Sequence, residues 1–211
     1  VLKDPFVAEK EVLQLGSWRW MGLQAKSLRR LELVAIGELE VLRQELLEAF
    51  PGAVLGSSVG FMSPHANAPA DPKYRAVCSG TTGHIEVLQM RFDNRIASYE
   101  DVVKFLFTFH DPTTRDSQEQ DQGTQYQSVV FFHSEAQKQT AEKVVNQVQA
   151  LLDGGQITKY KNEKIETEIL SATRFYSAHK AHQMYLEKVP NGYCNHRIRF
   201  KWENMDLTKL N

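Results

Sequence analysis

Hydrophobic residues recur at intervals of three and four along three stretches of the chain. This spacing places their side chains on one face of a helix, and it predicts helices over residues 38–50, 99–110 and 135–152. Pro51-Gly52 ends the first helix, because proline cannot continue the helical hydrogen-bond ladder. Ser134 precedes the third helix and is a typical N-cap. A last helical turn or two is predicted over residues 178–188.

Alternation of hydrophobic and polar residues predicts strands between these helices. The predicted strands span residues 30–37, 53–61, 84–92, 127–132 and 165–170. In the third of them Ile85 and Val87 alternate with Glu86 and Leu88, which indicates a strand with one buried face. Residues 113–123 are predicted to form a long polar loop, and such loops in compact domains are usually functional. Helices and strands mixed in this way predict an α+β fold.

The bulk composition narrows the classes of function. The chain has 211 residues, enough for one domain with a sizeable core, and its net charge is -1. This balance gives no indication of a nucleic-acid partner or an anionic membrane. No hydrophobic run reaches the roughly 20 residues of a membrane-spanning helix. The two cysteines are too few for a disulfide scaffold. No metal-binding cluster, phosphate loop or nucleotide motif is visible, so we predict no cofactor.

Three motifs carry a resemblance to a known family. They are Cys-Ser-Gly-Thr-Thr-Gly-His-Ile-Glu at residues 78–86, Asp-Gln-Gly-Thr-Gln-Tyr at 121–126 and Asn-Gly-Tyr-Cys at 191–194. In this order, after a helix that ends in Pro-Gly, they resemble the A-type peptide methionine sulfoxide reductases. The resemblance implies a two-layer, ferredoxin-like α+β core over residues 31–195. We therefore predict an N-terminal extension at residues 1–30 and a C-terminal tail at residues 196–211.

The resemblance also implies a reaction and the residues that serve it. In the family a cysteine thiolate attacks the sulfoxide sulfur, an acid protonates the oxygen, and a second thiol removes the resulting sulfenic acid. Glu86 matches the acid, and Tyr74 and Tyr126 match two phenols that hydrogen-bond the oxygen. Asp121 matches a carboxylate of the same pocket. Each also has a structural alternative: a solvent-facing strand glutamate, half-buried packing for the tyrosines, and a turn-forming aspartate.

The thiol that makes this attack has no obvious counterpart here. In the family it lies in a Gly-Cys-Phe-Trp motif at the start of the helix before Pro-Gly. Counting back along that helix places Glu38 at the cysteine position, which we favour. Residues 16–20 resemble the motif more closely and would place Ser17 there. Cys194 matches a recycling cysteine of the family, or else it is a leftover tail thiol. We interpret Cys78 as a small buried apolar residue.

These departures lead to a hypothesis of lost activity. We predict a catalytically inactive reductase-like protein that serves as a structural or interaction subunit of a larger assembly. Aromatic and basic residues of the terminal segments are predicted to contact protein partners. They are Trp18, Trp20, Arg197, Arg199 and Trp202.

Two alternatives to an inactive subunit stay open. One is a non-catalytic protein that binds methionine or methionine sulfoxide of a partner chain. The other is an active peptide-methionine (S)-S-oxide reductase that uses a displaced thiol, either Cys194 or Cys78. The sequence leaves the compartment open as well. A mitochondrial or plastid location, after removal of a targeting peptide, is a hypothesis drawn from the habit of the family.

Overall fold

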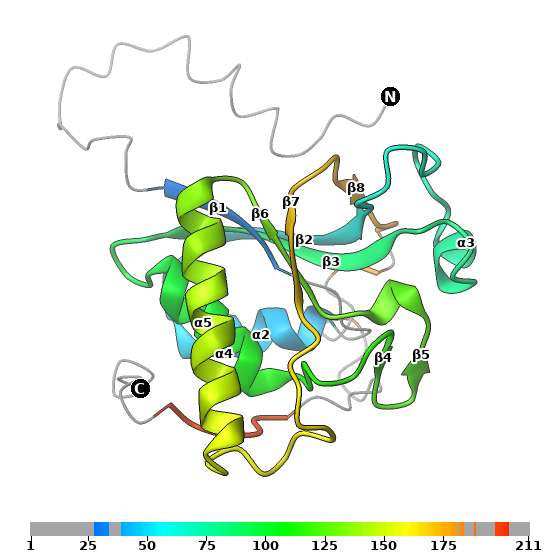
Figure 1. Cartoon of the computed structure of the whole chain (residues 1–211). Helices are drawn as coiled ribbons and strands as arrows, with labels where there is room; N and C mark the ends of the chain where they lie inside the picture. The colour runs from blue at the N-terminus through cyan, green and yellow to red at the C-terminus, as the bar shows by residue number, and fades with distance from the viewer. Residues whose placement is uncertain (1–27, 34–38, 181, 184–187, 189–196, 203–211) are drawn as a thin grey trace, which may run out of the picture.

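A six-stranded mixed sheet forms the centre of the molecule (Figure 1). The computed structural model describes residues 28–33, 39–180, 182–183, 188 and 197–202. The strands are β1 (Leu28–Leu33), β2 (Val54–Met62), β3 (Ile85–Asp93), β6 (Val129–Phe132), β7 (Glu168–Ser171) and β8 (Tyr176–Ser177). Their order is β7-β6-β1-β3-β2-β8, with β6 and β7 parallel and the other neighbouring strands antiparallel. The combination of helices with this sheet confirms the predicted α+β class.

Three helices pack against one another and against the sheet (Figure 1). They are α2 (Leu39–Ala49), α4 (Tyr99–Phe109) and α5 (Glu135–Asp153), each within a residue of its predicted range. Ser98 begins α4 with a capping box in which Asp101 returns the hydrogen bond. Ser134 caps α5, as predicted, by accepting a hydrogen bond from the Gln137 N–H. Local sequence signals therefore fix where these helices begin.

Strand β3 lies in the middle of the sheet. It pairs with β1 on one side and with β2 on the other, so Leu88 lies between Leu33 and Val59. The prediction that this strand has one buried face was wrong, because every residue from Ile85 to Met90 is buried. Successive side chains of a strand point to opposite faces, so both faces of β3 are covered. The Glu86 side chain is therefore buried in the protein rather than exposed to solvent.

The segment predicted as a long polar loop contains regular structure. It forms a short hairpin of β4 (Ser117–Gln118) and β5 (Asp121–Gln122), followed by the 3-10 helix η1 (Thr124–Tyr126). Strand β7 begins three residues after the start of its predicted range. Strands of two residues are too short to show an alternation of hydrophobic and polar residues, so the sequence did not reveal this hairpin.

The helical turn or two predicted over residues 178–188 does not extend through the whole range. Residues 178–179 are irregular and residues 180, 182 and 183 are turns, while residue 188 is helical; the other residues of the range lie outside the described part. The side-chain amide of Gln183 donates to the Val59 carbonyl at 2.7 Å and accepts from the Val59 N–H at 3.0 Å. These contacts hold the segment against the edge of β2, beside the β2–β8 pairing, and they replace helical hydrogen bonds.

Residues 197–202 pack onto the domain. The Arg199 N–H donates to the Thr108 carbonyl at 2.8 Å, and the Trp202 indole N–H donates to the Lys104 carbonyl at 3.2 Å. The prediction that Arg199 contacts a protein partner was wrong, because Arg199 is buried. Its guanidinium binds groups of this chain instead. Arg197 is exposed and Trp202 is half-buried.

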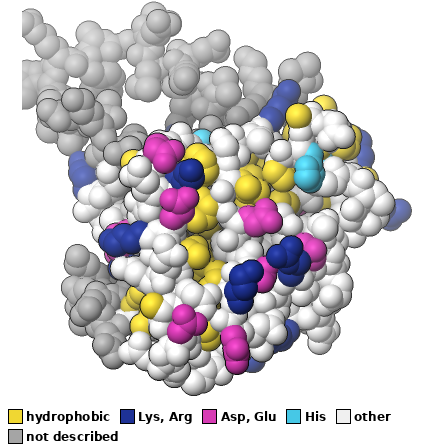
Figure 2. Space-filling view, in the orientation of Figure 1, with side chains coloured by type: hydrophobic (Ala, Val, Ile, Leu, Met, Phe, Trp, Pro, Cys, Tyr) yellow, Lys and Arg dark blue, Asp and Glu magenta, His cyan; other side chains and the backbone are white. Residues whose placement is uncertain are grey.

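The surface carries mixed charge. On the face shown in Figure 2, basic and acidic side chains are interspersed rather than gathered by sign. One such group joins α4 to α5, where Glu100 pairs with Lys104 and Lys143, both at 2.8 Å. Among the described residues, no helix has the length and hydrophobicity to cross a membrane.

Candidate active site

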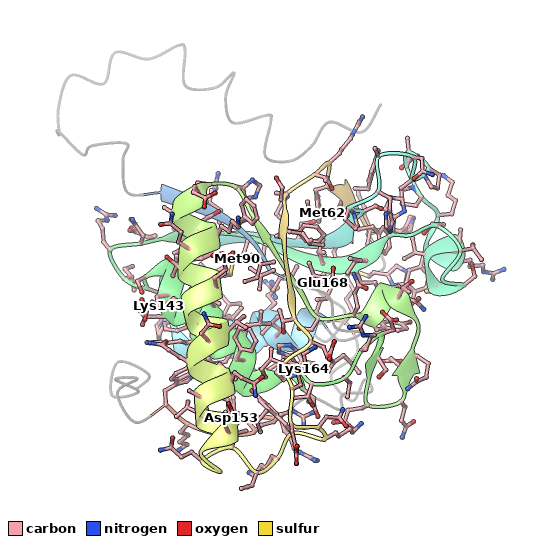
Figure 3. All side chains as sticks on the ribbon, in the orientation of Figure 1. Met62, Met90, Lys143, Asp153, Lys164 and Glu168 are labelled. Atoms are coloured by element: carbon pink, nitrogen blue, oxygen red, sulfur yellow. The ribbon has the colours of Figure 1, made fainter. Side chains whose placement is uncertain are left out.

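Three short segments meet at one end of the sheet (Figure 1). They are α3 (Tyr74–Cys78), the start of β3, and the stretch from β5 through η1. Met62, the last residue of β2, pairs with Ile85 at this end and is fully buried (Figure 3). The structure brings Tyr74, Glu86, Asp121 and Tyr126 together here, as their mutual electrostatic effects show. Four of the predicted site residues therefore share one location.

Glu86 is the most perturbed carboxyl of the site. Its exposed fraction is 9%, and burial together with the nearby Asp121 carboxylate raises its pKa to about 7. Burial disfavours the charged form, and a second negative charge does so again. Within the described residues, no hydrogen bond to the Glu86 carboxyl group is found. Near neutral pH the group therefore holds a proton that it can donate.

Two phenols and a thiol face this carboxyl group. The Tyr74 and Tyr126 hydroxyls and the Cys78 thiol lie close enough to affect one another's ionisation. Burial and the neighbouring acidic groups raise the pKa of Tyr126 to about 12 and raise that of Tyr74 as well. Both phenols thus stay protonated at physiological pH and act as hydrogen-bond donors.

Cys78 belongs to the site, contrary to its interpretation as a small buried apolar residue. It is half-buried and carries a free thiol. Burial and the Glu86 carboxylate raise its pKa, while the nearby hydroxyls of Tyr74 and Tyr126 oppose the rise. The sequence held one signal for this placement, since residues four apart on a helix share a face and Tyr74 lies four before Cys78.

Gln125 holds the segments of the site together. Its side-chain N–H donates to the Cys78 carbonyl at 3.0 Å and to the Gln122 carbonyl at 3.4 Å, and its exposed fraction is 2%. The amide therefore ties the end of α3 to the β5–η1 segment. Gly123 has a φ of 127° and lies directly against the Gln125 amide, where a Cβ atom would collide with it.

Aromatic side chains border the site. The imidazole of His182 stacks on the Tyr74 ring with centroids 4.0 Å apart, and Phe61 lies on the same ring at 6.5 Å. His84 packs edge-on against Tyr176 at 5.8 Å, and burial lowers the pKa of its imidazole, so it is neutral. These rings form an apolar wall next to the polar cluster, which is the surface that a thioether and its methyl group require.

Comparison with known proteins identifies the family. The family model described as peptide methionine sulfoxide reductase matches residues 43–210. The chain belongs to the peptide methionine sulfoxide reductase family. The match begins after both positions considered for the attacking thiol, Glu38 and Ser17, and both also lie outside the described residues. Cys194 lies within the matched range but outside the described residues, and Trp18 and Trp20 lie outside both.

Relatives of this family resemble the chain over most of its length. A probable peptide methionine sulfoxide reductase of Schizosaccharomyces pombe is 41% identical over 166 residues, which cover 78% of this chain and 91% of the relative. The MsrA of Natronomonas pharaonis is 40% identical over 136 residues, 64% of this chain and 72% of that protein. Reduced Mxr1 of Saccharomyces cerevisiae has a similar structure, with a TM-score of 0.72, 30% identity, and coverage of 83% of this chain and 94% of the yeast chain.

These comparisons correct the predicted function. The prediction of an inactive structural or interaction subunit was wrong; it rested on the missing thiol at the attacking side of the pocket. Relatives at about 40% identity, and the similar yeast structure, carry the names of reductases, and nothing in them indicates inactivity or a subunit role.

Proposed function

We propose that the protein is a peptide-methionine (S)-S-oxide reductase, which returns methionine sulfoxide in peptides to methionine. The observation that carries the proposal is the buried Glu86 carboxyl group, whose pKa lies near 7 and which faces two protonated phenols. The oxygen of a sulfoxide carries partial negative charge and is a strong hydrogen-bond acceptor, and this cluster offers it hydrogen-bond donors and an acid at the same place.

Each group of the cluster has a part in this reaction. Tyr74 and Tyr126 hydrogen-bond the sulfoxide oxygen and draw electron density from the sulfur, which makes the sulfur more electrophilic. Glu86 then protonates the oxygen as a thiol attacks the sulfur. Asp121 supports this step from a short distance, because its negative charge keeps Glu86 protonated up to about pH 7.

The reaction also needs a reductant to restore the thiol. The yeast protein Mxr1 has been crystallised in complex with Trx2, and that Mxr1 chain shares the fold of this one at 19% identity and a TM-score of 0.52. We propose a dithiol protein as the partner of this chain. A dithiol suits the chemistry, since it converts a sulfenic acid first to a mixed disulfide and then back to the free thiol.

The test is an assay of methionine formation from a peptide that contains one epimer of methionine sulfoxide, with dithiothreitol as reductant. The S-epimer is expected to be reduced, and the R-epimer is not. Glu86→Gln keeps the shape of the side chain but cannot donate a carboxyl proton, so the rate is expected to fall by about 10²-fold or more. Glu163→Gln is the matched control, because Glu163 is exposed and away from the site.

Two results would count against this proposal. One is a full-length protein that forms no methionine from either epimer. The other is a Glu86→Gln variant that works as fast as Glu163→Gln, which would remove Glu86 from the reaction.

A further inference from the structure

The Tyr74 phenol is weakly held by its own helix. Tyr74 is the first residue of α3, which spans five residues and whose N-cap, Lys73, makes no side-chain capping hydrogen bond. Tyr74 is also 41% exposed, so the core restrains only part of its ring. Such a side chain has more than one staggered rotamer open to it, and each rotamer sends the hydroxyl to a different place. The position of the hydroxyl therefore depends on the neighbours that contact the ring.

Two aromatic rings of the described residues contact the Tyr74 ring. The Phe61 ring lies 6.5 Å away between centroids and is tilted by 43°, while the His182 imidazole lies at 4.0 Å and within 27° of parallel. Phe61 pairs with Glu86 across β2 and β3, and directly opposed residues of neighbouring strands have their side chains on the same face of the sheet. Phe61 thus places the Tyr74 ring beside Glu86, and His182 covers that ring by stacking.

The segment that carries His182 is fastened to the edge of the sheet. The next residue, Gln183, pairs its side-chain amide with both backbone polar groups of Val59 and also donates to the Ala178 carbonyl at 3.1 Å. The Ala178 N–H donates to the Val59 carbonyl at 3.0 Å. Because Val59 lies in β2, the imidazole is fixed relative to the strand that carries Phe61.

The His182 imidazole is suited to stacking. Burial lowers its pKa, and the nearby positive charges of His179 and Lys188 lower it further, so the ring is neutral near neutral pH. A neutral imidazole stacks on a phenol through the contact of the two ring faces. The contact restricts the rotation of both rings and leaves the phenol hydroxyl free to donate.

We propose that His182 is a positioning residue of the reductase site, and that its stack on Tyr74 holds the phenol hydroxyl where it meets the sulfoxide oxygen. The inference rests on the proposed reductase function and adds a residue to it. Negative charge grows on the oxygen as the S–O bond breaks, so a correctly placed donor acts most strongly in the transition state. Loss of the stack should therefore lower kcat more than it raises KM.

The test measures kcat and KM for reduction of an S-sulfoxide peptide with dithiothreitol. His182→Ala removes the ring, and kcat is expected to fall by about tenfold while KM changes by less than about twofold. His182→Phe keeps a planar ring and is expected to restore kcat to within about threefold of wild type. His133→Ala is the matched control and should equal wild type, since His133 is exposed and lies between β6 and α5. Circular dichroism verifies that the variants are folded.

A double variant separates positioning from a general structural effect. Tyr74→Phe already lacks the hydroxyl that His182 places, so adding His182→Ala should lower kcat by less than about twofold further. A further loss of the full tenfold would show that His182 acts on another group, and it would overturn the inference. A His182→Phe variant as slow as His182→Ala would overturn it as well.

The failures of the inference and of the proposed function are distinguishable. Wild type that forms no methionine sinks the reductase function and the inference together. Wild type that is active, beside a His182→Ala variant with unchanged kcat, overturns the inference alone. If His182→Ala does not fold, His182→Leu decides, because leucine fills much of the space without a planar ring. A fall in its kcat of about fivefold or more supports the inference, and a kcat equal to that of wild type overturns it.

Discussion

The guanidinium of Arg199 lies 2.5 Å from the carboxylate of Glu119, and only 3% of Arg199 is exposed. Arg199 also donates to the Lys159 carbonyl at 3.2 Å, and Lys161 lies 3.3 Å from the same glutamate. Glu119 sits between β4 and β5, two residues before Asp121 of the site. The ion pair therefore fastens residues 197–202 to the hairpin that carries one of the site carboxylates.

Arg199→Met is expected to lower the free energy of unfolding by about 2–4 kcal/mol, because it removes the buried partner of Glu119 and leaves this carboxylate with Lys161 alone of the two cations. Arg197→Met is the control, since Arg197 is exposed and surface changes usually stay within about 0.5 kcal/mol. Urea unfolding of both variants measures the difference. Equal stabilities would show that the ion pair contributes nothing beyond packing.

This ion pair also predicts acid sensitivity. Hydrogen bonds from Arg199 and Lys161 lower the pKa of Glu119 in the folded protein. A carboxyl group with a depressed folded-state pKa stabilises the fold above its unfolded value, and that contribution is lost as the pH falls through the folded pKa. We expect wild type to lose stability below about pH 4. Glu119→Gln should flatten that part of the urea-midpoint curve.

Glu86 has the opposite effect on stability. Its folded-state pKa is about 7, above the unfolded value, so the folded protein binds a proton that the unfolded chain releases. Stability from this group is present at low pH and is lost as the pH rises toward 7. Glu86→Gln is expected to raise the free energy of unfolding by about 2–3 kcal/mol at pH 8 and by almost nothing at pH 4. A variant that is less stable than wild type at pH 8 would contradict the assigned burial cost.

The raised pKa of Glu86 also predicts the pH dependence of the rate. Glu86 must carry the proton that it donates to the sulfoxide oxygen. We therefore expect kcat/KM for the S-sulfoxide peptide to fall as the pH rises through about 7, where Glu86 loses this proton. In Glu86→Gln the inflection near pH 7 should vanish. Its persistence there would assign the proton to another group.

The phenols are expected to act on the rate rather than on folding. Tyr126→Phe and Tyr74→Phe each remove one hydrogen bond to the oxygen, so kcat/KM should fall by about 10- to 100-fold with little change in melting temperature. Tyr99→Phe is the matched control: Tyr99 begins α4, outside the motif segments, and its hydroxyl is buried and without a hydrogen-bond partner among the described residues. A loss in Tyr99→Phe as large as in the other two would point to a general effect of phenol removal.

Local sequence patterns predict much of this fold. Helices α2, α4 and α5 lie where apolar spacing and the caps at Pro51-Gly52 and Ser134 predict them. The fully buried β3 and the non-helical segment around Gln183 were missed, because their environment comes from residues far away in the sequence. Hydrophobic periodicity predicts which face of a helix or strand is buried, and it does not show whether distant residues also cover the opposite face.

The residues of the site were likewise predicted only in part. The motif spacing pointed to Glu86, Tyr74, Tyr126 and Asp121, and the structure brings these four together. Cys78 is half-buried beside this cluster rather than a fully buried apolar residue. The sequence could not show this, because Glu86 and Tyr126 approach Cys78 from other segments of the chain.

Gly123→Ala is expected to damage the site more than the fold. A Cβ at this position would collide with the Gln125 amide, which ties Cys78 to the β5–η1 segment, and the φ of 127° is strained for any other residue. Gly155→Ala is the control, since Gly155 also has a positive φ, of 70°, but nothing lies within 4 Å of its added Cβ. Both variants should lose about 1–2 kcal/mol of stability from backbone strain. Only Gly123→Ala should lose activity, by about tenfold or more, because a displaced Gln125 no longer fixes the Cys78 backbone. Equal activity in the two variants, measured at a temperature where both are folded, would show that the Gln125 tie does not position the site.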